Sequence, residues 1–267
     1  LQGPSTIYCI DMGLLKEFKK GGPSSQGGRA SVEYIKLATE LAMKGAVHAI
    51  VTGPISKTSL KMAGYTWPGH TEMLKDLTGV EDVAMLFYAT FEDKDLKVIL
   101  ATIHVALKDV PFLITEQRVL KTILFAQRGA QLFGIKTPRI GVSGLNPHAS
   151  EEGLFGDEEQ KAIIPALKRA SEAGLDVQGP VPPDVIFYKA LHGEFDIIVS
   201  MYHDHGLAPL KLIAFERAVN ITVGLPIIRT SPDHGTAYDI AWKGIANPSS
   251  MIEAIKVALR LKSGLKA

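Results

Sequence analysis

The chain has 267 residues, a formal net charge of +1, and 46% hydrophobic and 21% charged residues. Such a composition is ordinary for a globular protein with a large core, and it argues against a broad basic surface for nucleic acid or membranes, so any anion binding should be local. The single cysteine, Cys9, excludes an intrachain disulfide and a cysteine-rich metal site and suits a reducing cytoplasm. No apolar run approaches the roughly 20 residues that span a bilayer.

The first third of the chain predicts helices alternating with short strands. Glycine and serine residues predict a loop at 21–28, and apolar positions at helical spacing predict a helix from Arg29 to Met43. Ala46 to Val51 is typical of a short buried strand. Ser56 after this strand predicts the N-cap of a helix that opens with Lys57. A helix joined to such a strand is half of a parallel α/β unit.

A Gly-His-Thr sequence precedes the next expected helix, within residues 67–74. At a helix start, His70 and Thr71 could offer an imidazole, a hydroxyl and backbone N–H groups to an anion. Simple N-capping by Thr71 explains the same residues equally well. The residues alone leave both interpretations open.

The rest of the chain continues this alternation. Two apolar stretches around a polar turn predict a β-hairpin, and Asp184 is a candidate N-cap for a helix that ends at Leu191. The pattern predicts an α/β fold with a mixed sheet, while the G-x-G-x-x-G fingerprint of a dinucleotide-binding Rossmann unit is absent. The other expected elements are strands at 83–89, 96–102, 140–143, 197–199, 219–223 and 225–228 and helices at 112–133, 158–173 and 251–261.

The segment from Ile197 to Gly235 is the densest in ionisable side chains among core-type residues. It begins with an apolar strand, after which histidines, aspartates, a lysine and arginines follow in quick succession. Charged groups just beyond the ends of buried strands are where α/β proteins place binding and catalytic residues. We therefore interpret this segment as a wall of an active site.

Three histidines, His104, His148 and His203, each follow a short apolar strand and are expected in polar loops. Three neutral imidazoles suit a zinc or cobalt ion and leave positions open for a substrate. Alternatively, each is an isolated surface or hydrogen-bonded histidine, because no local spacing rule joins them. Asp184 and Asp204 could complete the coordination or orient a ring, or they could cap a helix and form a turn. A zinc hydrolase that needs no NAD could use the same triad.

A second group of polar residues, Lys211, Asn220 and Arg229, follows in the same segment. Arginine offers a planar fork to phosphate or carboxylate, lysine a point charge, and asparagine both a donor and an acceptor. Converging on one pocket, the three would hold a small dianion. Individually, each is better explained as a solvated charge or, for Asn220, as a polar residue at a sheet edge.

Several stretches of the chain carry a resemblance to a known family: VTGPISK, PGHTE, ATIHVALKDV, GLNPHASEEG, GPVPPD, MYHDHGLAPLK and AVNITVGLPIIRTSPDHGTAYDIA. From about Gly28 to Ser250 the chain resembles the 4-hydroxythreonine-4-phosphate dehydrogenases, the NAD-dependent family of vitamin B6 (pyridoxal phosphate) biosynthesis. The resemblance implies an isocitrate/isopropylmalate dehydrogenase-like α/β fold, with two lobes, mixed sheets and an interlobe cleft. It also implies a homodimer with active sites at the subunit interface, NAD or NADP, and a divalent metal (zinc, cobalt or magnesium).

The family implies oxidation of 4-phosphohydroxy-L-threonine to a 3-keto acid that decarboxylates to 3-amino-2-oxopropyl phosphate. Asp184 and Asp204 are candidates for the base, and Lys211 for stabilising the enolate formed on decarboxylation. We expect a lobe of residues 1–65 and 215–267 on the cofactor side and a metal-binding and dimerisation lobe of residues 66–214. The resemblance places the metal on His104, His148 and His203 and the substrate on His70, Thr71, Lys211, Asn220 and Arg229.

Departures from the family pattern keep the substrate open. The chain begins at Leu1 and lacks the family's N-terminal strand and Gly-Asp-Pro-Ala-Gly loop, so we expect a truncated chain, with an inactive dimerising remnant as an alternative. His205 stands where many members have Gln, and Ser150, Glu151 and Glu152 replace the usual Gly-Glu-Gly. Related branches act on D-threonate or D-erythronate 4-phosphate, or on cyclic diols.

Overall fold

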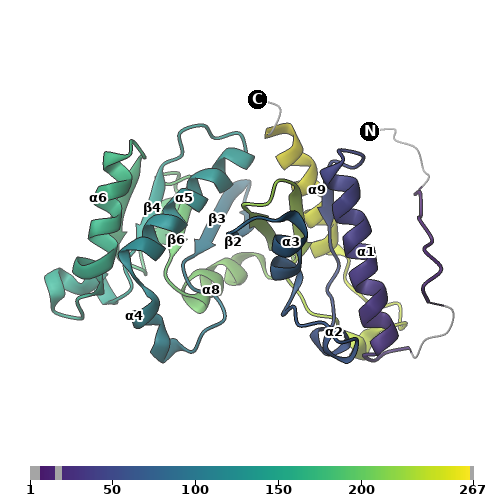
Figure 1. Cartoon of the computed structure of the whole chain (residues 1–267). Coiled ribbons are helices and arrows are strands. Elements are labelled where there is room, and N and C mark those ends of the chain that lie inside the picture. The colour runs from purple at the N-terminus through teal and green to yellow at the C-terminus, as the bar shows by residue number, and fades with distance from the viewer. Residues whose placement is uncertain (1–6, 16–19, 265–267) are drawn as a thin grey trace.

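The computed structural model describes residues 7–15 and 20–264. Its centre is an eight-stranded mixed β-sheet with helices on both faces (Figure 1). The strand order is β1-β8-β7-β2-β3-β6-β4-β5. The strands are β1 (Ala49–Val51), β2 (Ala84–Phe91), β3 (Lys94–Leu100), β4 (Ile140–Ser143), β5 (Val177–Val181), β6 (Ile197–Ser200), β7 (Val219–Val223) and β8 (Ile228–Pro232).

The directions of the strands decide where the loops gather. β3, β6, β4 and β5 are parallel, so their carboxyl ends lie at one edge of the sheet. β2 forms the predicted antiparallel hairpin with β3 and also pairs antiparallel with β7. β7 pairs antiparallel with β8, which is parallel to β1. Strands from both predicted lobes therefore belong to one continuous sheet, and the division into lobes stays a prediction.

Each helix buries an apolar stripe against the sheet or against another helix. One cluster of buried apolar side chains lies between the sheet and α5, α6 and α9, a second lies under α7 and α8, and a third joins α1, α2 and α3. The α-helices are α1 (Ser25–Met43), α2 (Lys57–Met62), α3 (His70–Thr78), α4 (Val110–Leu113), α5 (Glu116–Leu132), α6 (Ile164–Glu172), α7 (Ile186–Leu191), α8 (His203–Ala214) and α9 (Ser249–Gly264). Short 3₁₀ or π turns lie at Leu107–Asp109, Pro147–Gly153, Glu159–Ile163 and Tyr238–Ile240.

The α/β class with a mixed sheet is confirmed, but several predicted boundaries are wrong. The predicted loop at 21–28 contains the start of α1, because the Ser24 hydroxyl caps the helix by accepting from the Gly27 N–H at 3.0 Å. The helix expected at 112–133 is two helices, because Ile114 is extended (ψ 91°) and Thr115 caps α5. The strand expected at 225–228 begins only at Ile228.

One strand was missed and two expected helix caps are wrong, each for a local reason. β5 was not predicted, since its Gly-Pro sequence is typical of a loop; Pro180 is tolerated there because β5 is an edge strand that pairs with β4 alone. Asp184 does not cap α7, whose N-cap is Val185. Thr71 does not cap α3, because the N-cap is Gly69 and Thr71 lies within the helix.

Ser56, in contrast, caps α2 as predicted, accepting from the Ser59 N–H at 3.1 Å. α2 lies against α1 so closely that a Cβ on Gly28 would come within 2.1 Å of the Ser59 carbonyl oxygen. The absence of a side chain at Gly28 thus fixes the start of α1 beside the segment that follows β1. No helix within the described part of the chain is long and apolar enough to cross a membrane.

Candidate active site

His104 and His203 come together because they follow neighbouring parallel strands. His104 lies beyond the carboxyl end of β3, and His203 is the first residue of α8, directly after β6. The centres of the two rings are 5.8 Å apart. His203 was expected in a loop, so its position at a helix start is a correction. Because β3 and β6 are adjacent and parallel, the convergence follows from the topology.

The two histidines line a cavity of about 430 Å³. One wall is α8, in which His203, Leu207 and Lys211 recur every four residues and so share a helix face. The floor and the remaining walls come from the sheet, the start of α3 and the segment after β1. They include Thr52, Pro54, Ile55, Lys57, Gly69, His70, Met85, Phe87, Asn220, Arg229, Ser231, Asp233 and His234.

Arg229, on β8, supplies a buried positive charge to this cavity. Arg229 is 3% exposed to solvent. Its Nη2 and Nε donate to the Thr52 hydroxyl at 2.8 and 3.2 Å, and Nη1 donates to the Thr222 hydroxyl at 3.1 Å. Burial lowers the pKa of Arg229 to about 10, which still leaves it charged at neutral pH. A guanidinium held by neutral hydroxyls keeps its charge available to an anion.

His70 faces the same cavity as a neutral imidazole. It is the first residue of α3, after the N-cap Gly69. Burial, and then the positive charge of Arg229, lower the pKa of His70 to about 3. The ring is therefore uncharged across the physiological range, and one ring nitrogen can donate to a ligand while the other accepts.

Lys211 and Asn220 complete the predicted substrate group. The Lys211 ammonium lies 2.8 Å from a carboxylate oxygen of Asp233. The buried side-chain oxygen of Asn220, on β7, has no hydrogen-bond partner among the described residues. The structure thus brings together four of the five predicted substrate residues, while Thr71 does not line the cavity. Asp233, which sequence reasoning left without a role, joins them through Lys211.

The side chain of Asp204 contacts His203 rather than the cavity. The ring Nδ1 of His203 lies 2.8 Å from Asp204 Oδ1, so the carboxylate fixes the proton on Nδ1 and leaves Nε2 as an acceptor. This contact fits the interpretation that Asp204 orients a ring. Asp184 is exposed before α7 and does not line the cavity. A role for Asp184 or Asp204 as the base stays a prediction.

His148 lies outside the cavity, on the turn Pro147–Gly153 after β4. The buried carboxylate of Glu159 shapes this turn by accepting from the backbone N–H groups of Leu145 and Asn146 at 2.7 and 2.8 Å. His148 is exposed, with its ring centre 6.3 Å from that of Phe155. β4 is not adjacent to β3 but pairs directly with β6, so strand order separates His148 from His104 and does not by itself separate it from His203.

The predicted metal triad is therefore not assembled within one chain. Among the described residues, no group of three histidine, cysteine, aspartate or glutamate side chains is placed to hold a metal ion. His104 and His203 present two imidazoles, and burial, and then the positive charge of Lys57, lower the pKa of His104. A neutral imidazole is the form that ligates a metal. The structure thus brings together two of the three histidines predicted as metal ligands.

Residues 2–258 match the family described as pyridoxal phosphate biosynthetic protein PdxA. Over 239 residues, the chain is 49% identical to a 4-hydroxythreonine-4-phosphate dehydrogenase of Desulforapulum autotrophicum, covering 89% of this chain and 69% of that protein. Over 260 residues, it is 46% identical to a D-threonate 4-phosphate dehydrogenase of Salmonella typhimurium, covering 97% of this chain and 78% of that protein.

Solved structures show the same fold. A 4-hydroxythreonine-4-phosphate dehydrogenase from Klebsiella pneumoniae matches with a TM-score of 0.85 and 44% identity, covering 92% of this chain and 74% of that one. An isocitrate dehydrogenase from Methylococcus capsulatus matches with a TM-score of 0.50 and 14% identity, covering 92% and 86%, a likeness of fold alone. The predicted isocitrate dehydrogenase-like fold class is confirmed.

Replacing His70 with Gln should make the free energy of unfolding less dependent on pH below neutral pH. The folded-state pKa is about 3, below the ordinary value of 6.5, so the unfolded chain binds a proton first as the pH falls through this window. Wild-type stability therefore decreases as the pH falls, by about 1–2 kcal/mol at pH 5 from this residue. Urea unfolding at pH 7 and pH 5 measures the difference. The exposed His48→Gln is the control, and equal pH dependence in wild type and H70Q would contradict a buried neutral ring.

Proposed function

Because this chain belongs to the PdxA family of pyridoxal phosphate biosynthetic proteins, we propose that it oxidises 4-phosphohydroxy-L-threonine with NAD. The product is a 3-keto acid that decarboxylates to 3-amino-2-oxopropyl phosphate. The observation that carries the proposal is the cavity in which the cationic Arg229 and Lys211 face the paired imidazoles of His104 and His203. A phosphorylated hydroxy acid matches both features. The dehydrogenase names of the relatives favour oxidation over the zinc-hydrolase alternative.

D-threonate 4-phosphate is the second candidate substrate. A relative of that name is 46% identical over 97% of the chain, so similarity does not separate it from the threonine derivative. Both candidates carry a terminal phosphate and an oxidisable hydroxyl, and they differ at the second carbon, which bears an amine in one and a hydroxyl in the other. The unpaired Asn220 oxygen does not distinguish these groups, because an ammonium and a hydroxyl both donate to an amide oxygen.

In this proposal, different residues of the cavity bind the substrate, orient the metal ligand and stabilise developing charge. Arg229 and Lys211 hold the phosphate and carboxylate, with His70 as a neutral hydrogen-bonding partner. Asp204 keeps the His203 ring oriented, with its Nε2 left unprotonated for a metal. Lys211, held by Asp233, is placed to stabilise negative charge that develops on decarboxylation.

We further propose a homodimer with a shared metal site, formed by His104 and His203 of one subunit and His148 of a second copy. Two imidazoles converge while His148 is exposed elsewhere, which is the arrangement expected when one ligand serves a neighbouring subunit. Leu154 and Phe155, next to the His148 turn, are 71% and 45% exposed. Such an apolar surface suits contact with a second copy. When bound, a divalent ion would lower the pKa of the substrate hydroxyl.

We assign the cofactor to a second hollow of about 290 Å³. This hollow adjoins the cavity and shares Pro54 and Ile55 with it. The start of α1 and Lys20 border this hollow, and both favour a pyrophosphate. Trp242 offers an aromatic face to a base, with the Lys20 ammonium 4.4 Å from its ring centre. We place the adenosine end here and the nicotinamide in the cavity. The single exposed cysteine suits a cytoplasmic location, which cell fractionation would test.

The substrate assay follows NAD and NADP reduction by the purified protein. We expect reduction with 4-phosphohydroxy-L-threonine, loss of activity after chelation, and recovery when zinc, cobalt or magnesium is restored. D-threonate and D-erythronate 4-phosphates form parallel arms of the experiment. Reduction with a sugar-acid phosphate alone would keep the site and exchange the substrate. No reduction with any of the three, in protein that binds metal, would overturn the proposal.

Subunit complementation tests the shared metal site. His104→Ala and His148→Ala chains should each be inactive, but mixed dimers carry one intact site, so co-refolding equal amounts should restore about a quarter of the wild-type activity. The matched control mixes His104→Ala with His203→Ala, where both lesions fall on the same side of the site and no activity should return. Equal recovery in both mixtures, or none in the first, would refute the sharing.

Trp242→Ala tests the cofactor placement. Loss of a stacking partner should raise the KM for NAD about fivefold or more, while the KM for the phosphorylated substrate changes little. Steady-state kinetics with each substrate varied separately measure this split. Tyr34→Ala, which removes an exposed aromatic ring on α1, is the control. An unchanged KM for NAD in W242A would remove the ring from the cofactor site.

A further inference from the structure

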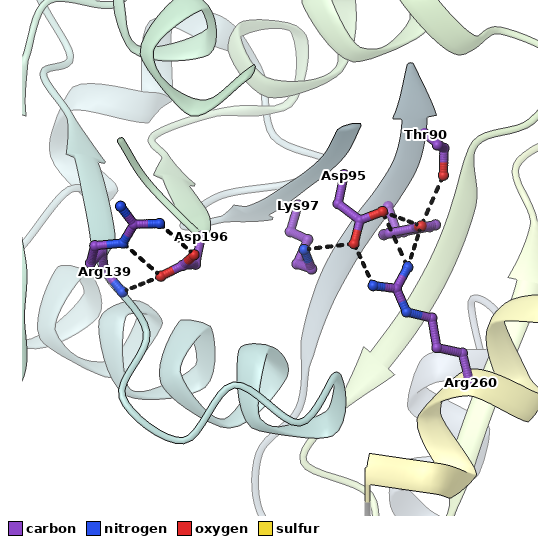
Figure 2. Close-up of polar contacts among 7 residues, drawn as sticks. Thr90, Asp95, Lys97, Arg139, Asp196 and Arg260 are labelled. Carbon is purple, nitrogen blue, oxygen red and sulfur yellow. Dashed lines mark hydrogen bonds and ion pairs between the residues drawn. The ribbon is translucent and has the colours of Figure 1, made fainter. Parts of the chain in front are cut away.

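A hollow of about 610 Å³ lies at the edge of the sheet opposite the candidate active site. It is bordered by the end of β2, the start of β3, the residues just before β4 and β6, and α9 (Figure 2). These are the amino ends of the parallel strands β3, β4 and β6. The hollow shares no lining residue with the active-site cavity.

Four cationic side chains and three carboxylates line this hollow, among them Asp93 on the turn between β2 and β3 and Lys94 at the start of β3, and the other five form a group of close contacts. Arg260 donates to Asp95 through Nη1 at 3.1 Å and Nη2 at 2.6 Å. Arg139 donates to Asp196 through Nε at 3.1 Å and Nη2 at 2.9 Å. Each carboxylate of this group is thus matched by one guanidinium. Lys97 is the remaining cation of the group: its Nζ lies 3.3 Å from Asp95 Oδ2, the oxygen that Arg260 already engages.

The Lys97 ammonium is poorly compensated for a buried charge. Its side chain is 5% exposed, and Nζ lies 5.1 Å from the centre of the Phe133 ring. Burial lowers the pKa of Lys97, and the positive charge of Arg260 adds to this effect, while the attraction of Asp95 and, less strongly, of Asp196 opposes it. A buried cation that shares one carboxylate with an arginine gains from a further negative partner.

The neighbouring carboxylate and phenol do not titrate near neutral pH. Burial would raise the pKa of Asp95, but hydrogen bonds from Arg260 and Tyr88 lower it to about 2. Burial and the bond to Asp95 raise the pKa of Tyr88 to about 12. Neither Asp95 nor Tyr88 therefore changes the charge of the hollow near neutral pH.

We propose that this hollow binds a phosphate group, either as inorganic phosphate or as a phosphate monoester, with Lys97, Arg139 and Arg260 as its cationic contacts. A phosphate dianion accepts several charge-assisted hydrogen bonds at once. Each guanidinium has five N–H donors. Arg139 uses three of them on Asp196 and the Gly193 carbonyl, and Arg260 uses three on Asp95 and Tyr88, so two on each remain for a phosphate beside Lys97. The hollow is large enough for a monoester. Because the two cavities share no residue, both can be filled at the same time.

Isothermal titration calorimetry of the full chain with inorganic phosphate tests the site. We expect two sites per chain, one in each cavity. Lys97→Met should weaken one site about tenfold or more, because a charge-assisted hydrogen bond is lost. Arg229→Lys should weaken only the other site, so a failure of the proposed active site would leave the Lys97 effect intact. Lys168→Met, which changes an exposed lysine on α6, is the matched control.

A second variant guards against misfolding. If circular dichroism shows that K97M is unfolded, Arg139→Gln, on a partly exposed side chain, should weaken the same site. Phosphate affinity unchanged in both variants, or weak binding that no substitution affects, would overturn the proposal. In a parallel arm, tighter binding of glycerol 3-phosphate than of phosphate would assign the site to a monoester, and equal affinity would assign it to inorganic phosphate.

Discussion

The parallel pairing of β3 with β6 is the constraint on which the candidate active site depends. The pairing continues beyond both strands, because the backbone N–H and the hydroxyl of Thr102 both donate to the Met201 carbonyl, at 3.1 and 2.7 Å. His104 lies two residues after Thr102, and His203 lies two residues after Met201. Their imidazoles therefore leave the sheet side by side, and the start of α8 directs Lys211 toward the same space two turns later. A shift in this register would separate the ring pair from the rest of the cavity.

The electrostatics of the cavity depend on an arginine whose partners are neutral. Burying a guanidinium is costly, and a carboxylate would reduce both the cost and the attraction for a ligand. Arg229 is held by two threonine hydroxyls instead, Thr52 from one side and Thr222 from the other. Burial, and then the field of Arg229, keep His70 neutral, so the site concentrates positive charge without a second titrating group at that wall. This arrangement suits a phosphorylated substrate better than an uncharged one.

Sequence reasoning located the parts of the site that local chain order determines. Residues just after buried strands, such as His104 and His203, can be recognised because the strand fixes their position. Asp233 could not be assigned, since its role depends on the packing of α8 against the end of β8. His148 followed the same strand-end rule as the other two histidines, yet it lies outside the cavity on the turn Pro147–Gly153, although β4 is adjacent to β6. Likewise β5, at the sheet edge, tolerates a proline that is typical of a loop.

The two hollows lie at opposite ends of the same parallel strands and are connected by β3. Lys97 and the last residue of this strand, Leu100, are three residues apart, roughly 10 Å at the ordinary rise of a strand. Salt screens charges inside a sheet much less than charges in solvent, so the field of an anion beside Lys97 reaches toward the other hollow through β3. The two hollows have no lining residue in common, so an anion in one does not displace a ligand from the other. A mechanical influence between them would require movement of β3, which pairs on both sides within an eight-stranded sheet. The sheet thus allows one fold to hold two proposed anion sites at the same time.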